Sequence, residues 1–420
     1  MEYCRRCVYP ANARPGIILD EKGVCSGCRL IESRPVIDWD EREKMLIEIL
    51  EKYRAYQREK NNPYDCIVPV SGGKDSHFQV YILKTKYKMN PLLVCYNHTF
   101  NTAVGLRNLA NLIDKMDCNL VRYTTAPGSA QRIASHMLKK VGDLTWHYHA
   151  GIMTFPIKAA VMYDVPLVVW GEEGFSELVG MHNQDDFVEF TKKKRQEHSM
   201  RGFEPEDLLN DPESGLTPYD LAPFFYPSDQ ELERVGVRGI YLSNFVSWNA
   251  HAQTQLVIKK LGFETAQKRE RTFQIYGKID DLHANGLHDY LKYLKFGYGR
   301  ATDDASTEIR HGRMTREEGI NMVREYDHVR PSDMDIFLRT VGMTDTDLLN
   351  MIEPLRDPSI WKKDASGQWQ TKDSVVNHVN DPGVEVARLP LKEFKSISPT
   401  PEKVSRHCQQ LHEQTEYVLL

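Results

Sequence analysis

A run of six small and charged residues has the composition of a phosphate-binding loop. Its members are Ser71, Gly72, Gly73, Lys74, Asp75 and Ser76. The two glycines let the backbone approach an anion closely, and N–H groups at the start of the following helix would point at it. The lysine adds a positive charge and the serines add hydroxyl donors. A bare phosphate would repel the aspartate, so we expect Asp75 to hold a Mg²⁺ ion that bridges phosphate oxygens.

The order of these residues excludes a Walker A loop, which reads GxxxxGK followed by Ser or Thr. Here Asp75 follows the lysine, and Val68 stands where the first glycine would be. The run SGGKDS instead resembles the PP-loop signature, SGGxDS, of the N-type ATP pyrophosphatases. That resemblance implies that ATP is cut between its α- and β-phosphates. A substrate oxygen would be adenylated, and a nitrogen or sulfur nucleophile would then displace AMP.

The same superfamily places adenine over the carboxyl ends of the first strands, which here include Tyr96. A polar cluster usually follows the fourth strand, and in this chain it comprises Gly171, Glu172, Glu173 and Glu177. The resemblance implies that one of these carboxylates completes the magnesium site, whereas a solvated loop is the alternative. The candidate catalytic residues are Lys74, Asp75, Glu172 and Glu173.

Four of the eight cysteines lie in the first 28 residues, as the CxxC pairs Cys4–Cys7 and Cys25–Cys28. Two such pairs at this spacing are typical of a Zn²⁺ ion held by four thiolates. We expect a structural zinc, because four thiolates leave no coordination position open. A surface that docks a partner or a tRNA is the alternative.

The elements that must position these residues alternate between strand and helix. Apolar runs predict strands at 64–70, 91–97, 120–125, 166–171 and 239–245, with helical patterns between them. This alternation predicts an α/β fold with a parallel sheet of the PP-loop type, covered on both faces.

We divide the chain into four parts on this basis. They are a zinc ribbon (1–36), a linking helix (37–62), a PP-loop domain (63–275) and a helical C-terminal region with a loose tail (276–420). An insertion at about 174–236 interrupts the PP-loop domain, and we expect it to form a lid or a partner surface, with disorder as the alternative.

Composition bounds the class of protein. The 420 residues are 41% hydrophobic and 27% charged, with a net charge of -5, which excludes a disordered polymer. The absence of a basic excess argues against nucleic acid as the main partner. No apolar run approaches the ~18 residues that span a bilayer, and the N-terminus lacks the apolar core of a signal peptide. We therefore expect a cytoplasmic protein that does not bind membranes.

Four segments of the chain together resemble one known family. YCRRCVYP, GVCSGC, VPVSGGKDS and KFGYGRATDDASTEIRHGRMTREEG are similar to the N-acetyl sugar amidotransferases, and the likeness covers most of residues 1–330. These enzymes turn an acetamido group of a bacterial surface sugar into an acetamidino group, in the synthesis of O-antigen sugars or of nonulosonic acids such as pseudaminic and legionaminic acid. The resemblance implies an N-acetylated nucleotide sugar or nonulosonic acid as substrate, and ATP, Mg²⁺ and Zn²⁺ as cofactors.

The resemblance also implies a partner. The ammonia would come from a separate glutaminase, similar to the glutaminase and cyclase subunits of histidine synthesis. Within the last segment, Lys295, Arg300 and Arg310 are candidates to bind ATP phosphates, a sugar carboxylate or a nucleotide diphosphate. An ion-paired helix connection is the alternative for each. The alternative function is a PP-loop tRNA thiolase, against which the lack of a second CxxC pair in the PP-loop domain argues.

Overall fold

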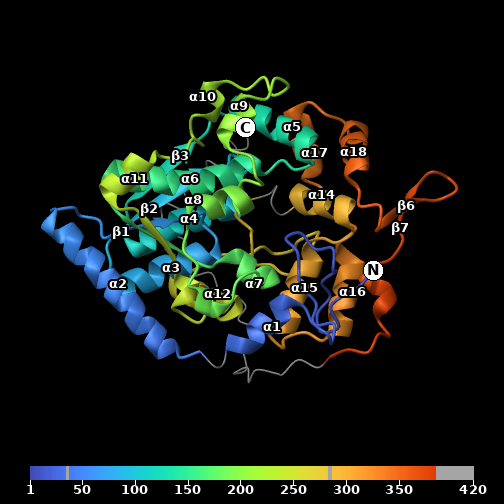
Figure 1. The fold of residues 1–420 in the computed structure, drawn as a ribbon, viewed down its shortest axis with the longest axis horizontal. Coiled ribbons are helices and arrows are strands. Elements are labelled where there is room, and N and C mark those ends of the chain that lie inside the picture. The colour runs from blue at the N-terminus through green and yellow to red at the C-terminus, as the bar shows by residue number, and fades with distance from the viewer. Residues whose placement is uncertain (35–36, 282–285, 385–420) are drawn as a thin grey trace.

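The computed structural model of the chain describes residues 1–34, 37–281 and 286–384 (Figure 1). Five parallel strands form one sheet in the order β3-β2-β1-β4-β5, which confirms the predicted α/β class. The strands are β1 (Cys66–Pro69), β2 (Pro91–Asn97), β3 (Leu120–Thr124), β4 (Leu167–Trp170) and β5 (Arg238–Tyr241). The chain leaves β1 toward β2 and later returns to its other side as β4. The loop after β1 therefore lies at the switch point of the sheet.

Helices cover both faces of the sheet because its central strands are apolar on both sides. One face carries α2 (Trp39–Glu59), α3 (Lys74–Thr85), α4 (Ala103–Met116) and α12 (Ala250–Leu261). The other face carries α5 (Pro127–Val141) and α6 (Trp146–Tyr163). The helix predicted to link the first two domains is present as α2. The Asp38 carboxylate accepts a hydrogen bond from the Glu41 N–H, 3.0 Å away, and caps this helix.

The insertion is a packed layer of short helices. They are α7 (Gly174–Val179), α8 (Lys192–Lys194), α9 (Pro205–Leu209), α10 (Pro218–Leu221) and α11 (Asp229–Val235). Phe190, Met200, Leu208 and Phe224 from this region are buried in the same core as α6. Their burial shows that this part of the insertion is packed and not disordered, because apolar side chains gain stability when they leave water. Its expected role as a lid or a partner surface stays a prediction.

The region after residue 276 is helical, as predicted, and then forms a hairpin. Its helices are α14 (Leu287–Phe296), α15 (Arg300–Arg310), α16 (Arg316–Tyr326), α17 (Met334–Val341) and α18 (Asp345–Ile352). The antiparallel strands β6 (Trp361–Lys363) and β7 (Trp369–Thr371) follow where we expected a loose tail. The remainder of that tail, 385–420, lies outside the described residues.

The N-terminal segment, with α1 (Ser26–Ser33), lies against α15 and α16 (Figure 1). Val8 and Tyr9 share an apolar cluster with Ile309 and Ile320. Residues near the N-terminus thus meet residues that lie about 300 positions further along the chain. The segment with the cysteine pairs is therefore held by the C-terminal helices.

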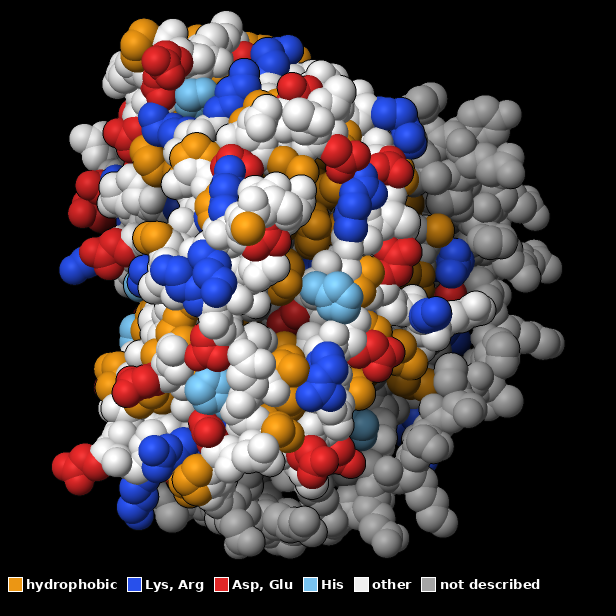
Figure 2. Space-filling view, turned by 90° about the vertical axis from the view of Figure 1, so that its right-hand side faces the viewer, with side chains coloured by type: hydrophobic (Ala, Val, Ile, Leu, Met, Phe, Trp, Pro, Cys, Tyr) orange, Lys and Arg blue, Asp and Glu red, His pale blue; other side chains and the backbone are white. Residues whose placement is uncertain are grey.

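The surface is mixed in charge on the face shown in Figure 2, where Lys and Arg side chains alternate with Asp and Glu. No basic patch gathers on this face. Among the described residues, no helix has both the length and the apolar character needed to cross a membrane.

Candidate active site

A cavity of about 380 Å³ lies at the carboxyl ends of the central strands, next to the loop after β1. Ligands bind at this point of open parallel sheets, so the fold itself designates the cavity as the candidate site. Most of the predicted nucleotide-site residues line it: Ser71, Gly73, Lys74, Asp75, Ser76, Tyr96, Gly171 and Arg300. The other walls come from α6 and from residues 278–300.

The phosphate loop is closed by hydrogen bonds between its own residues. The Ser76 hydroxyl accepts from the Ser71 N–H at 2.9 Å, and the Ser71 hydroxyl accepts from the Gly73 N–H at 3.2 Å. Gly72 has a φ of 94°, and a side chain there would lie 2.7 Å from the carbonyl oxygen of Gly105 in α4. Only glycine fits this position. Because α3 begins at Lys74, its first-turn N–H groups have no helical acceptor and are available to an anion.

Lys74 and Asp75 are paired with each other at the cavity wall. The Lys74 ammonium lies 2.6 and 2.7 Å from the two Asp75 oxygens. Burial disfavours the Lys74 charge, but the Asp75 and Glu172 carboxylates outweigh it and raise the pKa of Lys74. The loop therefore carries one positive and one negative side chain. The lysine suits a phosphate, and the aspartate suits the divalent cation that accompanies it.

The two glutamates after β4 differ in their surroundings. Glu172 has no hydrogen-bond or ion-pair partner in the described part of the chain. Burial and the nearby Asp75 carboxylate raise the pKa of Glu172 to about 7. Glu173 instead accepts from the Ser176 N–H and hydroxyl, both at 2.7 Å, and pairs with Lys194 at 2.8 Å. Glu173 caps α7, so its predicted catalytic and metal-binding role is corrected, and Glu172 is the free carboxylate.

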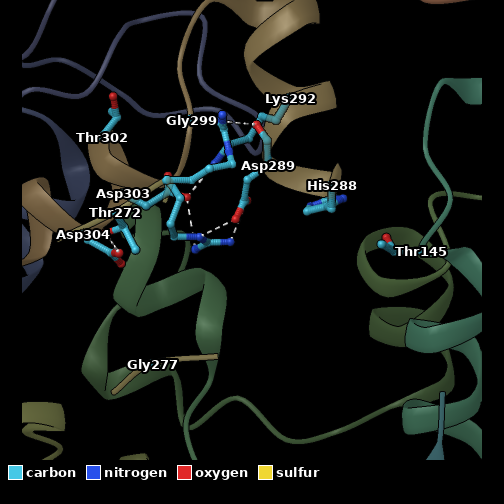
Figure 3. Close-up of polar contacts among 12 residues, drawn as sticks. Thr145, Thr272, Gly277, His288, Asp289, Lys292, Gly299, Thr302, Asp303 and Asp304 are labelled. Atoms are coloured by element: carbon cyan, nitrogen blue, oxygen red, sulfur yellow. Dashed lines mark hydrogen bonds and ion pairs between the residues drawn. The ribbon is translucent and has the colours of Figure 1, made fainter. Parts of the chain in front are cut away.

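Charged groups on α14 and α15, among them Asp289, Lys292 and Asp303, lie close together (Figure 3). Arg300 belongs to this network and lies in the cavity wall. Its guanidinium forms two hydrogen bonds with Asp289, both 2.8 Å long, and lies 3.2 Å from Asp303. Lys292 pairs with the same Asp303 at 2.5 Å. These carboxylates fix the guanidinium and raise the pKa of Arg300, although burial acts in the opposite direction.

Two predicted nucleotide-binding cations lie elsewhere. The Lys295 ammonium donates to the carbonyl oxygen of Gly142 at 2.8 Å, and the side chain is buried. Arg310 donates to the carbonyl oxygen of Leu178 at 2.7 Å and to the Cys25 sulfur at 3.6 Å. Neither residue lines the cavity. We therefore correct the prediction that they bind ATP: both hold neighbouring parts of the fold in place.

The cavity also contains residues that the sequence analysis missed, chiefly Lys278, Asp280 and His98. Asp280 lies beside the phosphate loop, since its Oδ1 is 3.4 Å from where a side chain on Gly73 would begin. Burial raises the pKa of Asp280 and lowers the pKa of His98 to about 4. The only signal in the sequence was a lysine and two aspartates in the short stretch 278–281, too little to predict a site.

The four N-terminal cysteines converge. Cys4 and Cys28 have sulfurs 3.9 Å apart, and Cys7 and Cys25 have sulfurs 3.7 Å apart. All four sulfurs lie within 4.8 Å of one another, and all four residues are buried. Sulfurs bound at about 2.3 Å to one tetrahedral ion would be about 3.8 Å apart. The donor set therefore fits a single metal ion.

The remaining described cysteines do not form a thiol site. Cys95 lines the cavity, but burial raises its pKa to about 11, so its thiol stays protonated at neutral pH. Cys66 and Cys118 also have raised pKa values because of burial, and neither lines the cavity. Cys408 lies outside the described residues. The described site thus lacks the cysteine pair that sulfur transfer commonly needs.

The sheet order and the loop define a PP-loop type α/β protein. Residues 270–375 match the family described as "LPS biosynthesis protein WbpG-like, C-terminal domain". The match confirms, for this part of the chain, the resemblance to the N-acetyl sugar amidotransferases. This WbpG-like segment supplies Lys278, His288 and Arg300 to the cavity wall.

Other comparisons are more distant. The chain is 27% identical over 118 residues to the uncharacterized protein MJ1599 of Methanocaldococcus jannaschii, which covers 28% of this chain and 41% of that protein. The chain thus spans about two fifths of the length of this curated relative.

Three solved structures are also similar, at low scores. The NH3-dependent NAD synthetase of Campylobacter jejuni is 14% identical, with a TM-score of 0.26, over 48% of this chain and 96% of that chain. The NMN synthetase of Francisella tularensis is 13% identical, with a TM-score of 0.27, over 53% of this chain and 87% of that chain. The U34-tRNA thiolase NcsA of Methanococcus maripaludis is 12% identical, with a TM-score of 0.31, over 79% of this chain and 91% of that chain. Scores of this size carry no argument about function.

Proposed function

We propose that the protein is an ATP-dependent amidotransferase that converts the acetamido group of a bacterial surface sugar into an acetamidino group. One observation carries the proposal. The SGGKDS loop opens into a cavity whose facing wall belongs to a segment that matches a family of lipopolysaccharide biosynthesis proteins. A loop suited to nucleotide phosphates and a WbpG-like segment therefore line one cavity. The tRNA thiolase alternative has no comparable support, because the described cavity offers no thiolate.

The chemistry follows from the poor reactivity of an amide. The carbonyl oxygen of the acetamido group attacks the α-phosphorus of ATP, the bond between the α- and β-phosphates breaks, and pyrophosphate leaves. The resulting O-adenylyl imidate has a good leaving group on its carbon. Ammonia then attacks that carbon and AMP leaves, so that NH replaces O. Water must stay out, since its attack would return the amide.

The residues of the loop have distinct roles in this scheme. Lys74 and the N–H groups at the start of α3 would hold the β- and γ-phosphates, where negative charge develops as pyrophosphate leaves. Asp75, with Glu172, would hold Mg²⁺, which supplies charge neutralisation at those oxygens when it is bound. Tyr96 and Gly171 line the same cavity at the ends of β2 and β4, where adenine would lie.

The remaining parts of the proposal concern cofactor, partner and place. We infer a structural Zn²⁺ on the four N-terminal cysteines, because a closed four-thiolate shell suits this ion. We also infer a separate glutaminase as the ammonia source, a nucleotide sugar or nonulosonic acid as substrate, and action in the cytoplasm.

The reaction is tested with the purified full chain, MgATP, ammonium and a panel of N-acetyl sugars. We expect AMP and pyrophosphate to form only when an accepted sugar is present, and the product sugar to be lighter by the difference between O and NH. Omission of the sugar is the control for idle hydrolysis of ATP. Sugar-dependent release of ADP and phosphate would contradict the proposal.

A further inference from the structure

Lys278 differs from the other cations of the cavity in having no partner. Among the described lining residues, Lys74 is paired with Asp75 and Arg300 is held by two aspartates. Lys278 has no hydrogen bond or ion pair with any described residue, and its side chain is exposed to solvent at the cavity. An anion that enters the cavity therefore meets one ammonium group that is free to bind it.

The backbone at Lys278 is held in an unusual conformation. Its φ is 49°, in the left-handed region that residues other than glycine, asparagine and aspartate rarely adopt. The flanking residues are tied down on both sides. Arg269 donates to the Gly277 carbonyl at 2.6 Å, and the Thr102 N–H donates to the Asp280 carbonyl at 3.2 Å. Strained backbone persists where surrounding contacts determine it, and such positions cluster at ligand sites.

The charges around Lys278 also favour an anion. The cavity walls remove part of the water around the Lys278 ammonium, and with the nearby Arg300 guanidinium they lower its pKa, while Asp289 and Asp303 act in the opposite direction. Both aspartates already neutralise Arg300 and Lys292. A bound anion would supply the missing counter-charge and stabilise the ammonium form.

We propose that Lys278 binds the negatively charged group of the sugar substrate, a carboxylate or a diphosphate, and so selects anionic over neutral N-acetyl sugars. This inference rests on the proposed function. The ATP phosphates already have Lys74, the helix N-terminus and the loop hydroxyls. Lys278 belongs instead to the WbpG-like segment, the part of the cavity that sets this protein apart from a general nucleotide-binding loop.

The test measures binding and does not depend on turnover. The variants are Lys278→Met, which removes the charge, Lys278→Arg, which keeps it, and the matched control Lys88→Met. Lys88 is also exposed and has a left-handed φ of 55°. It precedes β2 and so lies at the amino ends of the strands, whereas the cavity lies at their carboxyl ends. Calorimetry first gives the Kd of MgATP for each variant. In a second set of titrations, with α,β-methylene-ATP present, it gives the Kd of three sugars. UDP-N-acetylglucosamine carries a diphosphate, N-acetylneuraminic acid carries a carboxylate, and N-acetylglucosamine is neutral.

We expect a charged sugar to bind the wild type more tightly than the neutral one. Lys278→Met should weaken that binding by on the order of tenfold or more, as for the loss of a charge-assisted hydrogen bond. Lys278→Arg and Lys88→Met should retain it, and the Kd of MgATP should not change. If Lys278→Met weakens the binding of N-acetylneuraminic acid, the lysine binds a carboxylate. If it weakens the binding of UDP-N-acetylglucosamine, the lysine binds a diphosphate.

Two results would overturn the inference. One is an equal loss of MgATP binding in Lys278→Met, which would assign the lysine to the triphosphate. The other is that neither charged sugar binds the wild type more tightly than the neutral sugar does. Failure of the proposed function is seen separately, as the absence of AMP and pyrophosphate in the turnover assay.

Discussion

At the scale of single residues, Asp75 is the side chain whose chemistry is least replaceable. It is the acidic member of a loop built for anions, and it is bonded to the neighbouring Lys74. We expect Asp75→Asn to keep the fold but to lose ~10²–10³ in the rate of AMP formation, because a charge that stabilises the transition state is removed at constant size. Asp114→Asn, an exposed aspartate on α4, is the control. Full activity of Asp75→Asn would exclude its role as cation ligand.

Lys295 provides the converse prediction. It was a candidate nucleotide ligand, but its ammonium is buried against the Gly142 carbonyl. We expect Lys295→Met to leave the Kd of MgATP unchanged in calorimetry, whereas Lys74→Met weakens it strongly. A parallel loss in Lys295→Met would show that the lysine reaches the nucleotide.

The difference in stability between the wild type and Lys295→Met should depend on pH. Burial lowers the pKa of Lys295 from 10.5 to about 8, so folding releases its proton between these values. The wild type should therefore gain stability over Lys295→Met as the pH rises from about 8 toward 10.5. Urea unfolding across this range measures the difference.

The contrast between these residues shows what the sequence could predict of the site. The loop residues Ser71 to Ser76 are contiguous, so a local pattern was enough to find them. Lys278 and Asp280 reach the same cavity from about 200 residues further along the chain, and no local pattern encodes that approach. Residue type alone could not separate Arg300, which lines the cavity, from Arg310, which contacts the cysteines.

At the scale of elements, the N-terminal segment is connected to the cavity by consecutive contacts. Arg310 donates to the Cys25 sulfur and lies 5.2 Å from the centre of the Tyr9 ring. The Tyr9 hydroxyl donates to Asp303 at 2.6 Å, and Asp303 contacts Arg300 in the cavity wall. The segment with the cysteine pairs thus helps to position a charged group of the site.

We therefore expect Tyr9→Phe to raise the KM for the sugar, because it releases one of the groups that orient Asp303. Tyr298→Phe removes an equally buried hydroxyl that bonds to Arg14 instead, and it should have the smaller effect on KM. Both variants should keep their metal, since neither residue supplies a sulfur. If the two variants have equal KM values for the sugar, the hydrogen bond from Tyr9 to Asp303 contributes to stability and does not position the site.

The metal itself is tested by elemental analysis of the purified chain. We expect one zinc per chain, on Cys4, Cys7, Cys25 and Cys28. The double variant Cys25→Ser, Cys28→Ser should lose the ion and unfold at lower denaturant concentration, because metal binding and folding of such segments are coupled. Zinc retained at full occupancy in the double variant would refute the assignment.

The elements themselves were predicted well where a local pattern defines them. The five strands are short apolar runs, so they were found from the sequence, and the linking helix was found as α2. The packing of the insertion was not foreseen, because Phe190 and Phe224 give no periodic signal in short irregular helices, although both are buried in the core. The hairpin after residue 360 was missed because its strands are three residues long.

At the scale of the whole molecule, segments distant in sequence pack together. The N-terminal segment packs on α15 and α16, and the same C-terminal region reaches over the carboxyl ends of the strands (Figure 1). The cavity is therefore assembled from parts of the chain that lie about 200 residues apart. We expect its walls to limit the access of water to the proposed adenylate, since water would return the amide.

The last prediction concerns the source of ammonia. No described cysteine is free to serve as a glutaminase nucleophile: four converge on the metal site, and burial raises the pKa of Cys66, Cys95 and Cys118. We therefore expect the purified chain to form no acetamidino product from glutamine alone. Added ammonium should support the reaction, increasingly so at alkaline pH, because the unprotonated amine is the nucleophile. A cognate glutaminase should restore the use of glutamine at neutral pH, where free ammonia is scarce and must be passed on within a complex.

Mass spectrometry of the sugar with ¹⁵N-labelled glutamine or ammonium distinguishes the two sources. Robust incorporation of the glutamine label by this chain alone, in a preparation free of glutaminase, would contradict the proposed partner.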